Sequence, residues 1–224
     1  MPRQPYLPTF AHLNYAVGAL VLKERPELCA AIGKSIAMWS QVDNEMGCLL
    51  GILLGTDSDA ALEVFLSLRR ASNQIEALTA AAKHKLSGQE LDAFRAICRV
   101  YTSLEKQRND LAHGCFGICE QDTTVLFWIE VKDHVHFQTD TLTREARGDF
   151  PPDRHERLKK NMYVYRLSDL EMLYEDMEKF WWTIFYFNGY LRDPKNSYRI
   201  AEFDRLREFA AIKNARIYLQ GHAS

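Results

Sequence analysis

The segment EKQRNDLAHGCFG, residues 105–117, brings an arginine, an asparagine, an aspartate and a histidine within six positions. These residues are Arg108, Asn109, Asp110 and His113. An arginine is permanently charged and its forked guanidinium fits phosphate oxygens. A histidine titrates near neutrality and can move a proton to or from a ribose hydroxyl. Together the two side chains supply what metal-free attack of a 2′-hydroxyl on the adjacent phosphodiester requires.

The position of Arg108 predicts a partner for its charge. Arg108 continues the apolar row of a predicted helix, so we expect the guanidinium to point toward other helices or a partner subunit. The row consists of Phe94, Ile97, Tyr101 and Leu104. Asp43 falls on the apolar stripe of an earlier predicted helix, where a carboxylate is costly unless it is paired. We therefore predict a contact between Asp43 and Arg108.

The spacing within the motif constrains how it acts. Five residues on an ideal helix correspond to about 140° around the axis, so Arg108 and His113 do not share a face, whereas Asn109 and His113 do. Either the helix loosens at Gly114, or two chains combine their residues. The second option predicts a dimer with the site at its seam.

Helices must position these residues. Apolar spacings of three, four and seven predict helices over 26–54, from Asp57 or Ser58 to about Leu86, and from the LSGQEL turn to the motif. Gly55 is expected to end the first helix, and Gly114 to be the left-handed cap of the third. Three long helices with short turns predict a mainly α fold built as an antiparallel bundle.

The sequence changes character at Cys115. Residues 115–137 are rich in β-branched and aromatic side chains and predict a β-hairpin that turns at Gln121 and Asp122. A polar loop over 139–160 and one more strand, MYVYRL, follow. The capping box SDLE predicts that Ser168 opens a fourth helix, and a last charged helix is expected from about Tyr198 to Leu219.

These elements predict a simple domain organisation. Residues 1–25 form an irregular N-terminal arm with three prolines, and residues 26–224 form a single helical domain. Within that domain we expect core helices over 26–114, a β insertion and loop over 115–167, and C-terminal helices over 168–219.

Here the chain resembles a known family. Three helices, with W…VD in the first and RNDLAHG closing the third, look like the HEPN domain (higher eukaryotes and prokaryotes nucleotide-binding). The resemblance implies a metal-independent endoribonuclease without a cofactor, dimeric, often a toxin with a cognate antitoxin protein or a phage-defence component. Carried over by position, Arg108 binds the scissile phosphate, His113 is the general acid or base, and Asn109 contacts the RNA substrate. Asp43 and Asp110 are supporting residues.

Composition limits the partners. The formal net charge of -2 gives no general attraction to nucleic acid, so any RNA contact must be local. The five cysteines are an odd number scattered through apolar segments, and no signal sequence opens the chain, which predicts a cytoplasmic protein. No apolar run reaches the roughly 20 residues that span a bilayer, so we expect no membrane contact.

Other readings remain open. Glu130 and Lys132 on a predicted strand, with Asp122 upstream, resemble the Asp…Glu-x-Lys pattern of metal-dependent nucleases. His134 and His136 alternate on one predicted strand face but lack further ligands, and Cys115 and Cys119 are expected to be packing residues. A non-catalytic helical binding or assembly module is the alternative function. It predicts that Arg108 and His113 are sealed inside one subunit.

Overall fold

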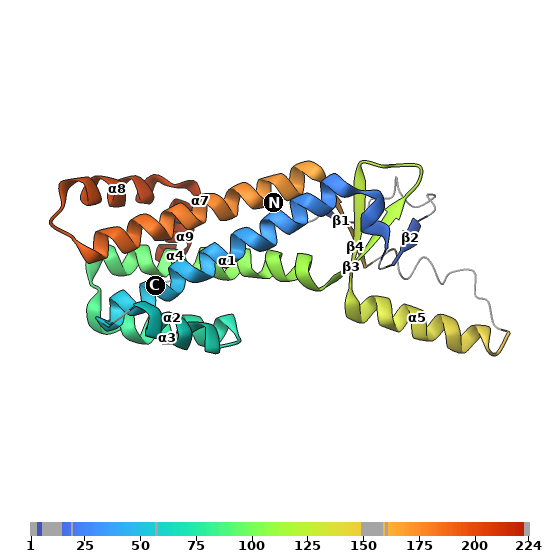
Figure 1. The fold of residues 1–224 in the computed structure, drawn as a ribbon, viewed down its shortest axis with the longest axis horizontal. Helices are drawn as coiled ribbons and strands as arrows, with labels where there is room; N and C mark the ends of the chain where they lie inside the picture. Colours follow the sequence, from blue (N-terminus) through green and yellow to red (C-terminus); the bar gives the residue numbers. More distant parts are fainter. Residues whose placement is uncertain are drawn as a thin grey trace. The chain divides into compact units, whose positions relative to one another are not determined.

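The computed structural model describes residues 4–5, 15–18, 20–56, 58–148, 159 and 161–221. Figure 1 shows long helices and a small sheet, so the predicted mainly α class is confirmed. The chain forms two compact units. We call Met1–Ile36 with Gln107–Glu175 the sheet unit, and Ala37–Lys106 with Asp176–Ser224 the helical unit.

Three long helices contribute residues to both units. They are α1 (Pro26–Leu54), α4 (Gly88–His113) and α7 (Leu167–Arg192). The start of α1 at Pro26 agrees with the preference of proline for the first helical turn. Its end is marked by Gly55, whose φ of 66° is the left-handed conformation that stops a helix. The predicted first helix is confirmed at both ends.

Four shorter helices complete the helical unit. They are α2 (Ser58–Ser67), α3 (Ala71–Lys85), α8 (Ser197–Glu208) and α9 (Ala210–Gly221). Aromatic contacts join the helices. Trp39 of α1 lies 5.0 Å from Tyr101 of α4, and Phe203 of α8 stacks on Tyr190 of α7 at 4.3 Å. The guanidinium of Arg99 lies over the ring of Tyr218 of α9.

Two helices expected to be continuous are each broken in two. The predicted helix over 58–86 is α2 and α3, and the predicted last helix is α8 and α9. The side chain of Gln74 donates at 3.2 Å to the carbonyl of Phe65, which also accepts from the backbone N–H of Leu68, so Gln74 adds a second hydrogen bond at the first break. Neither break has a glycine or proline, and the apolar spacing continues across both.

Among the described residues, the sheet unit contains five antiparallel strands in the order β1-β5-β4-β3-β2. Their bounds are β1 (Gln4–Pro5), β2 (Tyr15–Val17), β3 (Gly114–Cys119), β4 (Val125–Glu130) and β5 (Met162–Arg166). The predicted hairpin and the predicted MYVYRL strand are β3, β4 and β5. The segment expected to be an irregular arm supplies both edge strands, followed by a short 3-10 helix, η2 (Val21–Glu24).

Alternation along the strands gives the sheet two apolar faces. One face holds Cys119, Val125, Phe127, Ile129, Met162 and Val164, with Cys115 packed against it. The two cysteines are therefore packing residues, as predicted, and all five cysteines are free thiols. On the other face lie Phe116, Leu126 and Trp128, which are also buried.

The segment after β4 differs from the expectation. Residues predicted to finish the hairpin and begin a loop form α5 (Val131–Glu145). The β-branched and aromatic residues near its start are typical of a strand, but none of the side chains of the segment is fully buried, and Phe137 packs partly buried against the sheet. An ion pair between Asp140 and Arg144 at 2.8 Å has the spacing of one helical turn. Most of the predicted loop that follows lies outside the described residues.

The fourth helix begins one residue earlier than predicted. Ser168 does not cap α7. Instead, the carboxylate of Asp169 accepts a hydrogen bond at 2.9 Å from the backbone N–H of Arg166, which precedes the helix. This is the return half of a capping box shifted by two residues. It ties the end of β5 to the start of α7.

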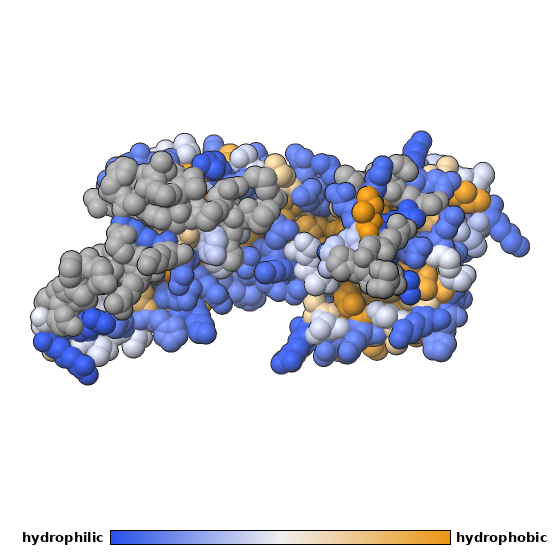
Figure 2. All heavy atoms as spheres, turned by 180° about the vertical axis from the view of Figure 1, so that it is seen from behind, coloured by the Kyte–Doolittle hydropathy of each residue, from blue (hydrophilic) through white to orange (hydrophobic). Residues whose placement is uncertain are grey.

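The surface is mainly polar on the face seen in Figure 2, where hydrophobic side chains form separate small patches. Among the described residues, no helix combines the length and the apolar character needed to cross a membrane.

Candidate functional site

The motif residues all lie in the last turns of α4, which is helical through His113. His113 is exposed, and Arg108, Asn109 and Asp110 are half-buried. The apolar row that precedes Arg108 is buried, as predicted. Consistent with its place on that row, the Nε atom of Arg108 is sealed from solvent. The helix therefore presents the imidazole outward and holds the guanidinium partly inside.

Asp43 is half-buried and hydrogen-bonded within the helical unit. Its carboxylate lies 2.9 Å from the hydroxyl of Tyr101, which is also 2.9 Å from the side-chain oxygen of Gln74. The hydrogen bond from Tyr101 lowers the cost of keeping the carboxylate of Asp43 half-buried. The predicted contact of Asp43 with Arg108 would join the two units and stays a prediction.

The regular geometry of α4 shows how Arg108 and His113 are arranged within a single chain. Because the helix continues to His113, Arg108 and His113 point about 140° apart around its axis. Asn109 and His113 differ by only about 40° and share a face. The helix does not loosen before His113. One chain alone therefore offers an Asn109–His113 face rather than an Arg108–His113 pair.

The end of α4 is held by a residue of the hairpin. The indole Nε1 of Trp128 in β4 donates a hydrogen bond of 2.6 Å to the backbone carbonyl of Asp110. Gly114, expected to be a left-handed cap, is instead the first residue of β3 and has no positive φ. A Cβ at Gly114 would collide with the indole of Trp128. The glycine of the motif is thus required by a close approach and not by a turn.

A second acidic side chain lies near the motif. The register of β3 and β4 pairs Gly114 with Glu130, and Glu130 is exposed. Paired residues in antiparallel strands lie about 5 Å apart, so Glu130 is close to the residue that follows His113. The chain then enters α5, where burial lowers the pKa of His134. Glu130 is therefore a titratable group of β4 near the end of α4, and His134 follows it four residues later in α5.

The hypothesis that Asp122, Glu130 and Lys132 form the metal site of a nuclease does not fit the structure. It needs Glu130 and Lys132 on one strand, but Lys132 lies in α5. Asp122 bonds the hydroxyl of Thr124 at 2.6 Å in the turn at the far end of β4. Six residues of strand separate the two carboxylates by nearly 20 Å. In the part of the chain that the structure describes, no three metal-binding side chains cluster.

The histidine pair predicted on a strand face is also rearranged. His134 and His136 lie in α5, where a spacing of two residues corresponds to about 200° around the axis. They point in different directions and cannot hold one ligand together.

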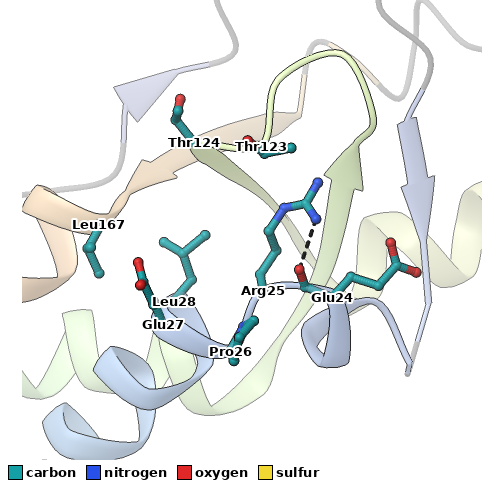
Figure 3. A pocket seen from close by; sticks show the side chains of 8 residues that line it. All are labelled: Glu24, Arg25, Pro26, Glu27, Leu28, Thr123, Thr124 and Leu167. Atoms are coloured by element: carbon teal, nitrogen blue, oxygen red, sulfur yellow. Dashed lines mark hydrogen bonds between the residues drawn. The ribbon is translucent and has the colours of Figure 1, made fainter.

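The described residues also form a pocket of about 540 Å³ at the start of α1. It is lined by Glu24, Arg25, Pro26, Glu27, Leu28, Thr123, Thr124 and Leu167. Figure 3 shows Arg25 extending toward the turn that carries the two threonines. Arg25 donates to the carbonyls of Glu24 and Cys119. This turn is at the opposite end of the hairpin from Gly114, so the pocket is separate from the motif.

Comparisons of the chain with protein-family models, with curated proteins and with solved structures gave no significant match.

Sequence reasoning found the motif but missed the residue that holds it. The signal for Trp128 was a large aromatic residue on a predicted strand that follows a glycine-containing helix end. Using that signal requires the register of the hairpin. A turn centred on Gln121 and Asp122 predicts a register that differs by one residue from the observed one.

Proposed function

We propose that this protein is a metal-independent endoribonuclease of the HEPN type that acts as a homodimer. The observation that carries the proposal is the motif at the end of α4, where an exposed His113 is the last helical residue and Arg108 lies five residues earlier. Strand β3 follows His113 directly and pairs with β4, and this hairpin supplies the rigid support that such a site needs.

The proposed chemistry is a transfer within the RNA strand. His113 takes the proton of a ribose 2′-hydroxyl or delivers one to the leaving oxygen, and Arg108 neutralises the phosphate that is attacked. A bond forms between the 2′-oxygen and phosphorus while the bond to the 5′-oxygen breaks. The products are a 2′,3′-cyclic phosphate and a 5′-hydroxyl. Asn109, on the same face as His113, hydrogen-bonds the substrate.

A second copy of the chain completes the proposed site. The 140° separation within one helix keeps Arg108 and His113 of one chain from converging on one phosphate. In a two-fold dimer, Arg108 of one protomer would meet His113 of the other at a shared seam. The partly buried setting of Arg108 supports such an arrangement, because a partner surface can surround the guanidinium.

Cleavage of single-stranded RNA in EDTA tests the proposal. We expect wild-type protein to cleave and His113→Ala to lose about 10²- to 10⁴-fold in rate. His84→Ala is a matched control, because His84 is also an exposed histidine in the last turn of a helix, α3. Loss of activity on chelation, or full activity of His113→Ala, would contradict the proposal.

The same site supports a role as a toxin or in phage defence. Expression of the wild-type chain should then slow growth, and Arg108→Ala should relieve the effect. A cognate antitoxin protein encoded next to the gene would bind the wild-type chain and block cleavage.

A non-catalytic helical module is the alternative, and it requires Arg108 and His113 to be sealed inside one subunit. The exposure of His113 supports the enzyme over this alternative. A well-folded dimer that cleaves no RNA under any condition would favour the module.

A further inference from the structure

We infer that Trp128 is a positioning residue for His113, so that the β3–β4 hairpin belongs to the site and is not a separate appendage. The inference rests on the proposed function, because positioning has meaning only if His113 acts on a substrate. It also makes a structural claim about His113 that holds without any activity.

The first argument is the hydrogen bond at the end of α4. In a continuing helix the carbonyl of Asp110 would accept from the N–H of Gly114, but Gly114 begins β3. The indole of Trp128 takes that place at 2.6 Å. The side chain of Trp128 is only 3% exposed, so water competes weakly for this bond.

The second argument is steric. A Cβ at Gly114 would occupy the space of the indole, so the residue after His113 must be a glycine for the ring to approach. The tryptophan thus contacts the chain on both sides of His113. It binds the carbonyl of Asp110 three residues before and packs on Gly114 one residue after.

The third argument is that the ring is itself held by the sheet. Trp128 pairs with Phe116 on β3 and with Tyr163 on β5. The ring of Tyr163 lies 5.9 Å away and meets the indole edge-on. Since β4 has a neighbouring strand on each side, the indole is anchored to a rigid element and not to a loop.

The consequence concerns the last turn of a helix, which commonly frays. With the Asp110 carbonyl bound, the turn that contains His113 stays helical up to the strand. The imidazole then leaves the helix on the face of Asn109 in one defined direction. A small error in that direction is costly, because a displacement of about 1 Å can lower a rate about 100-fold.

The test uses Trp128→Phe, which keeps an aromatic ring and removes the donor, in the full-length chain. We expect kcat for RNA cleavage to fall roughly 10- to 100-fold while KM stays within about twofold. We also expect the ring resonances of His113 to shift in NMR spectra, identified by their absence from His113→Ala. Trp182→Phe is the control, because Trp182 is exposed on α7 and should change neither quantity.

Gly114→Ala provides a second variant. Its extra methyl group displaces the indole while keeping the donor, so it should reproduce both effects if Trp128→Phe fails to fold. Unchanged kcat and unchanged His113 resonances in a folded Trp128→Phe would overturn the inference. If the wild-type protein cleaves no RNA, the proposed function fails, and the His113 resonances alone decide whether Trp128 positions this side chain.

Discussion

The two units place the polar side chains of their long helices in different settings. Inside the helical unit they bond one another, as Tyr101 does with Asp43 and as Asn188 does with Glu45 at 2.9 Å. In the sheet unit, α4 ends on an exposed His113 whose setting is fixed by a backbone bond to Trp128. One helix therefore packs in a core with residues 88–106 and exposes an imidazole in its last turn. For the site proposed above, the difference teaches that the way in which α4 ends matters more than the way in which it packs.

The largest expected effect is on the core of the helical unit. Phe94→Ala should lower the free energy of unfolding by about 3–5 kcal/mol, because it removes a buried ring and leaves a cavity. Leu142→Ala in α5 should change it by less than about 0.5 kcal/mol, since Leu142 is 68% exposed. Urea denaturation measures both. Equal losses would show that α5 is covered in solution and would weaken the contrast between the units.

The next effect comes from the buried polar network. Tyr101→Phe removes a hydroxyl that lies within 2.9 Å of both Asp43 and Gln74, so it should cost about 1–3 kcal/mol. Tyr198→Phe is the matched control, because that tyrosine is largely exposed. If the two variants melt at the same temperature, the hydrogen bonds of Tyr101 contribute nothing to the free energy of unfolding.

The pH dependence of stability should single out Cys98. Burial raises the pKa of this thiol from 9.0 to about 12. The native state therefore holds the proton more tightly than the unfolded chain does. The resulting stability is fully present below pH 9 and is lost as the pH rises toward 12. Denaturation at several alkaline pH values should show a shallower decline for Cys98→Ala than for the wild type, and an identical slope would contradict this.

A smaller effect of opposite sign is expected from His134 in the sheet unit. Burial lowers its pKa below 6.5, so the unfolded chain takes up a proton more readily than the folded one. Stability from this group is present above pH 6.5 and declines as the pH falls below it. His134→Gln should reduce the loss of stability between pH 7 and pH 5. A steeper loss in the variant would mean that His134 is stabilised in its charged form.

The sequence predicted the elements that carry strong local signals. Pro26 and Gly55 bound α1 because each has a backbone preference that acts whatever the tertiary contacts are. The buried row of α4 followed from its spacing, and the MYVYRL strand from its β-branched and aromatic residues. These signals depend only on neighbouring residues.

What could not be predicted depends on contacts between distant residues. The breaks before α3 and α9 keep the apolar spacing, and the first is stabilised by Gln74 reaching back to Phe65. The helix α5 begins with residues that favour strands, and none of its side chains is fully buried, so the local composition predicted the wrong element.

In the candidate site too, the features with local signals were predicted and those that depend on distant contacts were not. Arg108 and His113 were found from residue type and spacing alone. The role of Gly114 was mistaken, because the reason for the glycine is a tryptophan 14 positions later. A two-residue turn at Gln121 and Asp122 would have shifted the hairpin by one residue and placed Trp128 on the other face relative to β3.

The most direct measurement mixes two inactive variants, Arg108→Ala and His113→Ala, under conditions that allow subunits to exchange. Half of the dimers are then mixed, and each mixed dimer has one complete site, so about a quarter of the wild-type RNA cleavage should return. Each variant alone should remain inactive. Failure of the mixture to regain any cleavage, although mass measurements show mixed dimers, would contradict a site shared between two chains.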